Sequence, residues 1–270
     1  MFKHSIFSLP FIFIAMIISA DGWFGYELLF LGVVSAITAR NFAMAFNRYL
    51  DIDHDSLNPR TVNRPSVDGR LNSNTILTFT LLNGLGFIVT AYFVNQLALY
   101  LSIPILIILA SYSYFKRFSY LAHIILGLSL GLAPIAGVVA VEETITLWSI
   151  YLSLGVLFWV AGFDLLYSLQ DMEFDKKFGL HSIPSKFGSK KTFLISGIFH
   201  ILTVVFWGLT IFEAGLGLFG EFAVIFSILM LGYEHYLVHK DFRKIDKAFF
   251  TINGYLGILF FSFIVLEKWV

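Results

Sequence analysis

Long apolar runs separated by short polar segments dominate the sequence. Runs such as LSIPILIILASYSYF (101–115) and GILFFSFIVLEKWV (257–270) are continuous rather than alternating, which favours helices over the strands of a membrane barrel. The pattern predicts an all-α fold: a polytopic membrane protein of about nine transmembrane helices in one bundle with a central cavity, as a single domain over residues 1–270. The predicted spans are residues 5–20, 26–50, 73–94, 97–115, 120–140, 145–171, 190–212, 217–239 and 247–267.

Composition supports a membrane protein and excludes several other classes. Hydrophobic residues make up 58% of the chain and charged residues only 13%, about half the charged share of an ordinary soluble domain. The net charge is zero, so the chain lacks the basic footprint of a nucleic-acid-binding protein. The sequence contains no cysteine, which excludes disulfides, thiol catalysis and metal sites built on Cys.

The basic residues orient the predicted spans. With the N-terminus inside, sixteen of the eighteen Lys and Arg residues fall on one side of the membrane; Arg40 and Lys268 are the exceptions. The positive-inside rule makes that side cytoplasmic. We therefore expect a multi-pass protein of the cell inner membrane, with the loops after the second and sixth spans both facing the cytoplasm.

The first acidic motif lies at the end of the second predicted span. Asn47, Asp51 and Asp55 follow one another at intervals of four residues, which places them on one face of a helix about 6 Å apart along its axis. Oxygen-bearing side chains in this arrangement suit a hard cation such as Mg²⁺, which often shares its ligands with a phosphate. Arg60 and Arg64 follow the motif and suit phosphate oxygens. The alternative is a solvated end of a membrane helix, and solvent is the environment we expect for the neighbouring Asp53 and His54.

A second acidic motif follows the sixth predicted span. Asp171 and Asp175 are again four residues apart, and Asp164 lies two turns deeper on the same face. Basic residues follow again, at Lys176, Lys177 and Lys186. Carboxylates gathered in this way repel one another unless cations lie between them. Together the two motifs predict two metal half-sites that face one diphosphate.

Arg40 lies within the second span, two turns deeper than Asn47 on the same face. A charged side chain at that depth is costly and marks a functional site by default. Two hypotheses remain open: Arg40 binds a substrate anion such as a carboxylate, or it forms an ion pair with Asp164 that only neutralises both.

Four sequence elements, in this order, resemble the UbiA superfamily of intramembrane aromatic prenyltransferases along nearly the whole chain. They are N-x-x-x-D-x-x-x-D at Asn47, Asp51 and Asp55; the R/K-T-x-x-R-P run at Arg60, Thr61, Arg64 and Pro65; Y-x-x-x-K-R at Tyr112, Lys116 and Arg117; and D-x-x-x-D at Asp171 and Asp175, preceded by Phe163, Asp164 and Tyr167. Arg48 departs from the N-D-x-x-D pattern of many 4-hydroxybenzoate enzymes. The elements look most like a sub-branch associated with menaquinone synthesis through futalosine.

The resemblance implies an enzyme of respiratory quinone biosynthesis that transfers a polyprenyl group from its diphosphate to a hydroxylated aromatic carboxylic acid. The acceptor stays open between 4-hydroxybenzoate and 1,4-dihydroxy-6-naphthoate. The implied Mg²⁺ ligands are Asn47, Asp51, Asp55, Asp171 and Asp175, and the implied diphosphate ligands are Asn47, Arg60, Arg64, Lys116 and Arg117. Arg40, Tyr112 and Tyr167 would bind the acceptor, and Asp164 would orient its hydroxyl or take a proton.

Two other functions fit parts of the sequence. A cation-coupled transporter can also carry intramembrane charges and acidic clusters. A haem- or chlorophyll-directed prenyltransferase of the same superfamily would take a larger acceptor, for which Arg40 has no evident use. The remaining histidines, among them His123, have no carboxylate at helical spacing and receive no predicted role.

Overall fold

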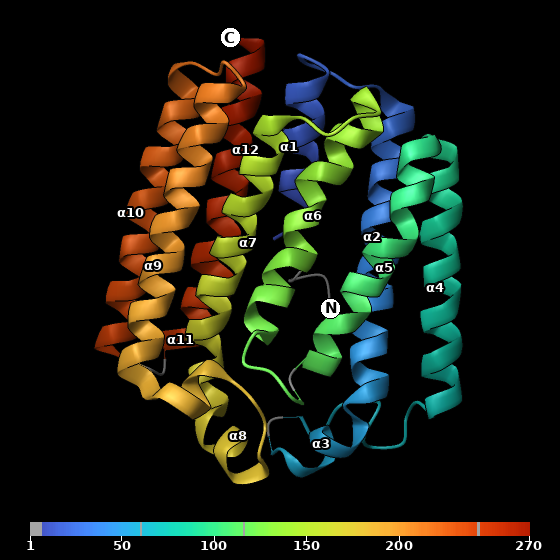
Figure 1. Cartoon of the computed structure of the whole chain (residues 1–270), viewed down its shortest axis with the longest axis vertical. Helices are drawn as coiled ribbons and strands as arrows, with labels where there is room; N and C mark the ends of the chain where they lie inside the picture. Colours follow the sequence, from blue (N-terminus) through green and yellow to red (C-terminus); the bar gives the residue numbers. More distant parts are fainter. Residues whose placement is uncertain (1–6, 60, 116, 242–243) are drawn as a thin grey trace.

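The computed structural model describes residues 7–59, 61–115, 117–241 and 244–270. Within these ranges the chain is a bundle of helices that run roughly along one direction, with short helices across one end (Figure 1). The long helices are α1 (Leu9–Ser19), α2 (Tyr26–Leu50), α4 (Ser73–Val94), α5 (Gln96–Phe115), α6 (Ala122–Glu142), α7 (Leu147–Ser168), α9 (Ile183–Glu213), α10 (Leu218–Lys240) and α12 (Asn253–Trp269). The short elements are α3 (Ile52–Leu57), the 3-10 turn η2 (Leu169–Asp171), α8 (Met172–Phe178), α11 (Ile245–Lys247) and the π-helical turn η4 (Ala248–Ile252).

The predicted all-α membrane fold is confirmed for the described residues. Eight helical segments are long and apolar enough to cross a membrane, and the shorter apolar helix α1 stands where the first of the nine spans was predicted. The start of α9 differs most from the prediction. Helix α9 begins at Ile183 rather than near 190, because Ser182 and Ser185 form a capping box and Pro184 occupies the first turn. It then kinks at Gly188, whose φ of 75° suits a residue without a side chain.

Close packing of α6 against α7 sets the centre of the bundle. A Cβ on Gly127 would collide with the carbonyl oxygen of Leu157, and a Cβ on Gly131 would lie 2.8 Å from the carbonyl oxygen of Ser153. The two glycines are one turn apart, so they let the two backbones approach along a common line. The Gly127–Gly131 pair therefore acts in the packing of α6 against α7.

An aromatic core fixes α1, α7, α9 and α12 to one another. The rings of Phe11 and Trp207 stack with centroids 5.4 Å apart, and Trp159 is fully buried beside them. The indole N–H of Trp159 donates to Asn253 Oδ1 at 2.7 Å, and the Asn253 amide donates to Glu234 Oε1 at 2.7 Å. Glu234 Oε2 has no hydrogen-bond partner among the described residues. None of the three side chains lines the polar or the apolar cavity described below, so they belong to the scaffold rather than to the site.

The short helices α3 and α8 lie together at one end of the bundle (Figure 1). Helix α3 follows α2, and α8 follows α7, so each acidic motif sits where a long helix gives way to a short one. The two loops therefore lie on the same side, as the charge pattern predicted.

Candidate active site

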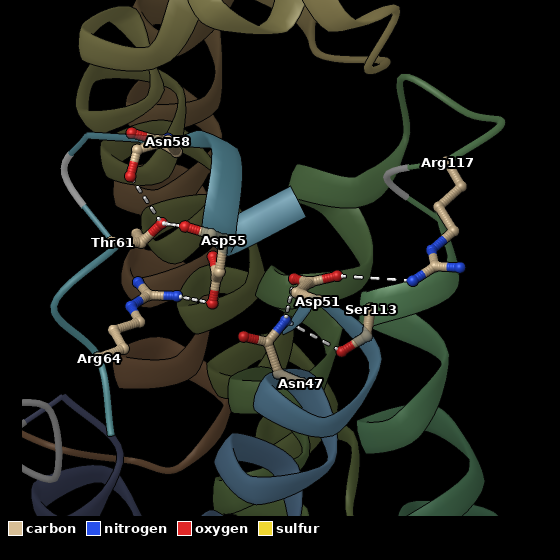
Figure 2. A network of polar contacts seen from close by, with 8 residues as sticks. All are labelled: Asn47, Asp51, Asp55, Asn58, Thr61, Arg64, Ser113 and Arg117. Atoms are coloured by element: carbon tan, nitrogen blue, oxygen red, sulfur yellow. Dashed lines mark hydrogen bonds and ion pairs between the residues drawn. The ribbon is translucent and has the colours of Figure 1, made fainter. Parts of the chain in front are cut away.

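The first acidic motif spans the junction of α2 and α3. Asp51 has non-helical backbone angles (φ −91°, ψ 8°), yet the Asp55 N–H still donates to the Asp51 carbonyl at 2.8 Å. The helical spacing therefore survives the junction, and both carboxylates are buried, at 9% and 8% exposure. Asn47 donates through Nδ2 to Asp51 Oδ2 at 2.9 Å and to Ser113 Oγ on α5 at 3.1 Å, which fixes α2 to α5 beside the motif (Figure 2).

The loop after α3 folds back over Asp55. Arg64 donates from Nη1 to Asp55 Oδ2 at 2.6 Å, and the Thr61 hydroxyl donates to the Asp55 carbonyl at 2.9 Å (Figure 2). Asn58 ends α3 with an extended backbone, as a residue before proline prefers. Arg64, which follows the motif in the sequence, thus forms an ion pair with Asp55, the second carboxylate of the motif.

Arg117 supplies a second cation to the same region. Its guanidinium donates to the Leu50 carbonyl at 2.6 Å and lies 4.0 Å from Asp51 Oδ1. The side chain is 39% exposed, so it stays accessible from the polar end of the bundle. Arg60 and Lys116, the other two predicted diphosphate ligands, lie outside the described residues.

The second acidic motif is held by the turn between α8 and α9. Asp171 closes the 3-10 turn η2, and Asp175 lies within α8. Asp175 Oδ2 accepts a hydrogen bond of 2.6 Å from the hydroxyl of Ser182, the residue that caps α9. Gly179 ends α8 with φ 68°, a conformation that lets the chain turn back toward Ser182.

Both motifs line one polar cavity of about 330 Å³. Ten of the predicted site residues are on its wall: Asn47, Asp51, Asp55, Arg64, Tyr112, Arg117, Asp164, Tyr167, Asp171 and Asp175. The first and second halves of the chain therefore each contribute an acidic motif to a single site.

An apolar cavity of about 300 Å³ adjoins the polar one, and Met44 and Tyr112 line both. Arg40 is on the wall of the apolar cavity, among residues such as Phe87 and Phe163. Its position at depth is as predicted. The ion-pair hypothesis for Arg40 is wrong, because Asp164 Oδ2 instead pairs with His123 Nδ1 at 2.7 Å.

Three histidines line the polar cavity against expectation: His54, His123 and His181. His123 received no predicted role, since its carboxylate partner is 41 residues away and no local spacing reveals it. His54 was expected in solvent but lines the polar cavity, whereas its neighbour Asp53 is exposed as predicted. His54 is three residues after Asp51 and seven after Asn47, so helical spacing itself places it on the face of the motif, which the expectation overlooked.

The donor set suits a divalent cation that binds together with a phosphate. Among the described residues, no three His, Asp or Glu side chains converge on a common point. The carboxylates instead surround the cavity. Mg²⁺ usually keeps several waters and binds through one or two carboxylates plus substrate phosphates, so carboxylates spread around a cavity are compatible with it.

The described residues form an all-helical membrane bundle. Acidic motifs and guanidinium groups surround one cavity, and an apolar cavity adjoins it. This arrangement defines a membrane-embedded enzyme whose substrate is part polar and part lipid-like. The chain belongs to the UbiA prenyltransferase family, whose model matches residues 8–264. This membership decides against the transporter alternative.

Individual proteins support the family assignment. The chain is 28% identical over 258 residues to a 4-hydroxybenzoate octaprenyltransferase of Tolumonas auensis, covering 93% of this chain and 88% of that protein. The solved apo structure of a UbiA homolog from Aeropyrum pernix K1 matches with a TM-score of 0.89 and 28% identity over 99% of this chain and 98% of that one. A UbiA homolog from Archaeoglobus fulgidus bound to DMAPP and Mg²⁺ shares the fold, with a TM-score of 0.79, 20% identity and coverage of 98% and 96%.

Proposed function

We propose that this protein transfers a polyprenyl group from polyprenyl diphosphate to a hydroxylated aromatic carboxylic acid, in respiratory quinone biosynthesis. The observation that carries the proposal is the pairing of two cavities: a polar one with acidic motifs from both halves of the chain, and an apolar one with an arginine in its wall. The polar cavity suits a diphosphate with its cations, and the apolar cavity suits the reacting ends of the prenyl chain and the acceptor.

The acidic residues would hold the donor's head. Asn47, Asp51 and Asp55 from one side, and Asp171 and Asp175 from the other, would hold Mg²⁺. The ion would supply positive charge that stabilises the diphosphate as a leaving group. Arg64 and Arg117, together with Arg60 and Lys116 from the sequence motif, would neutralise the remaining charge. The cytoplasm is the side from which we expect the diphosphate head to enter, given the basic residues at that end.

The aromatic residues would protect the allylic cation. Tyr112 lines both cavities, so its ring lies where the diphosphate-bearing carbon and the acceptor would meet. Tyr167 packs on Phe249 with ring centroids 4.3 Å apart and lines the polar cavity beside it. Ring faces stabilise a nearby cation, and an apolar wall excludes the water that would quench it.

The function is tested by supplying the purified protein in detergent with geranyl diphosphate, Mg²⁺ and each candidate acceptor in parallel. We expect mass spectrometry to find prenylated 4-hydroxybenzoate or prenylated 1,4-dihydroxy-6-naphthoate, and EDTA to abolish the product. Folded protein that gives no product with either acid, with geranyl or longer donors, would reject the proposed acceptor class and favour a larger acceptor.

Arg40 is expected to bind the acceptor's carboxylate. Arg40→Met should raise KM for the aromatic acid about 10- to 100-fold, because a hydrogen bond to a charged group contributes about 1.5–3 kcal/mol. KM for geranyl diphosphate should stay unchanged. The methyl ester of the acceptor offers a matched control, since wild type and variant should use it equally. A variant that keeps the wild-type KM for the acid would assign its binding elsewhere.

A further inference from the structure

A buried histidine–carboxylate pair lies in the wall of the polar cavity, and the diphosphate chemistry does not use it. His123, on the first turn of α6, is 5% exposed, and its Nδ1 lies 2.7 Å from Oδ2 of Asp164 near the end of α7. Both residues line the polar cavity. Neither belongs to the two D-x-x-x-D pairs.

The pairing determines which imidazole nitrogen is free. An ionised carboxylate can only accept hydrogen bonds, so a neutral imidazole paired with it carries its proton on Nδ1 and presents its lone pair at Nε2. Nε2 is buried and has no hydrogen-bond partner among the described residues. A buried polar atom without a partner costs about 1–3 kcal/mol. The cost is explained if Nε2 is kept for a ligand that enters the cavity.

The helix packing holds this pair in place. His123, Gly127 and Gly131 succeed one another by single turns on one face of α6. The two glycines lie against the backbone of α7, so the register of the two helices is fixed by contact of main chain with main chain. His123 meets Asp164 one turn farther along the same line. The imidazole is therefore oriented by a rigid element rather than by a loop.

We propose that His123 Nε2 is the general base for the aromatic acceptor, and that Asp164 positions the imidazole and stabilises the imidazolium that forms. This inference rests on the proposed function. The acceptor's hydroxyl proton passes to Nε2, and the ring carbon beside that oxygen uses a π-electron pair to bond to C1 of the prenyl group. The C1–O electron pair leaves with diphosphate. The resulting dienone loses its ring proton to diphosphate as it becomes aromatic again, and the imidazolium returns its proton to the phenolate oxygen.

This assignment divides roles that the sequence could not separate. Asp164 was expected to orient the hydroxyl or take a proton itself. Because its Oδ2 is occupied by Nδ1, it acts through His123 instead, as the carboxylate of a serine-protease triad acts through its histidine. Asp164 is thus a positioning residue and His123 the catalytic one.

The test compares two acceptors of different acidity in three proteins. We would measure kcat for wild type, His123→Gln and Asp164→Asn with the accepted aromatic acid and with its analogue fluorinated beside the hydroxyl. A positioned base contributes about 10²–10⁴-fold, so we expect both variants to lose about 100-fold or more in kcat with the parent acid. The loss should shrink at least about fivefold with the fluorinated acid, because its more acidic hydroxyl depends less on a base.

The controls distinguish a failure of this proposal from a failure of the proposed function on which it rests. His239→Gln alters an exposed histidine away from both cavities and should leave kcat unchanged. Equal losses with both acceptors would mean a structural role and overturn the proposal, as would wild-type kcat in either variant. If one variant fails to fold, the other still decides the outcome. No product from wild type with any aromatic acid would instead reject the proposed function itself.

Discussion

Asp51→Ala and Asp171→Ala will each reduce prenyl transfer by about 1,000-fold or more while leaving the protein folded. Each substitution removes a carboxylate that lines the polar cavity, and each acts from a different half of the chain. Electrostatic stabilisation of a leaving group by a bound metal is a matter of several kcal/mol, and about 4 kcal/mol corresponds to three orders of magnitude in rate. Product formation by mass spectrometry, with thermal unfolding in detergent as the test of folding, measures both quantities.

The chain supplies matched controls within the same short helices. Asp53 lies between Asp51 and Asp55 but is exposed, and Glu173 lies between Asp171 and Asp175 and is exposed as well. Asp53→Ala and Glu173→Ala change the net charge by the same amount and should leave the rate within about twofold. Equal losses in all four variants would show that general acidity of this end, rather than the cavity carboxylates, supports the reaction.

Gly127→Ala will lower the unfolding stability by about 1–3 kcal/mol, the usual effect of overpacking a tight contact. The added methyl group would collide with the Leu157 carbonyl, a backbone atom that cannot move without separating α6 from α7. Activity should fall as well, because the same contact holds His123 against Asp164. Thermal unfolding in detergent and prenyl transfer, measured on the same sample, report the two effects.

Gly208→Ala is the matched control for this prediction. Gly208 also lies inside a long helix, α9, but a Cβ there would meet no atom within 4 Å. Alanine has a helix propensity up to about 1 kcal/mol better than glycine. This variant should therefore equal or exceed the wild-type stability. Similar stability changes in the two variants would mean that the α6–α7 contact tolerates a methyl group.

The sequence predicts the fold well because bilayer spans are long and locally encoded. Continuous apolar runs reveal their own helices, and only the ends differ, as at Ile183, where a cap and a proline start α9 early. The two acidic motifs are equally local, since four-residue spacing on a helix defines a face. The charge asymmetry of the loops predicts that both motifs lie on the same side, and the packing of the helices brings them to one cavity.

The missed parts of the site depend on contacts between distant helices. His123 gains its significance from Asp164 on another helix, and that proximity depends on how Gly127 packs against α7. The His123–Asp164 contact is not written in a periodic pattern of residues. His54 differs, because its spacing from Asn47 and Asp51 already places it on the face of the motif that lines the cavity. The alternative that paired Arg40 with Asp164 failed because equal depth does not ensure contact.

The adjoining cavities give the two products of the proposed reaction different routes out. Diphosphate is released among Arg64, Arg117 and the exposed polar end, where water can take it away. The prenylated acid no longer carries the diphosphate, and it forms in the apolar cavity. Its tail partitions into lipid. Each turnover therefore divides its products between water and lipid. Diphosphate returns to the aqueous pool, and the prenylated acid stays in the bilayer as the substrate of the next membrane enzyme.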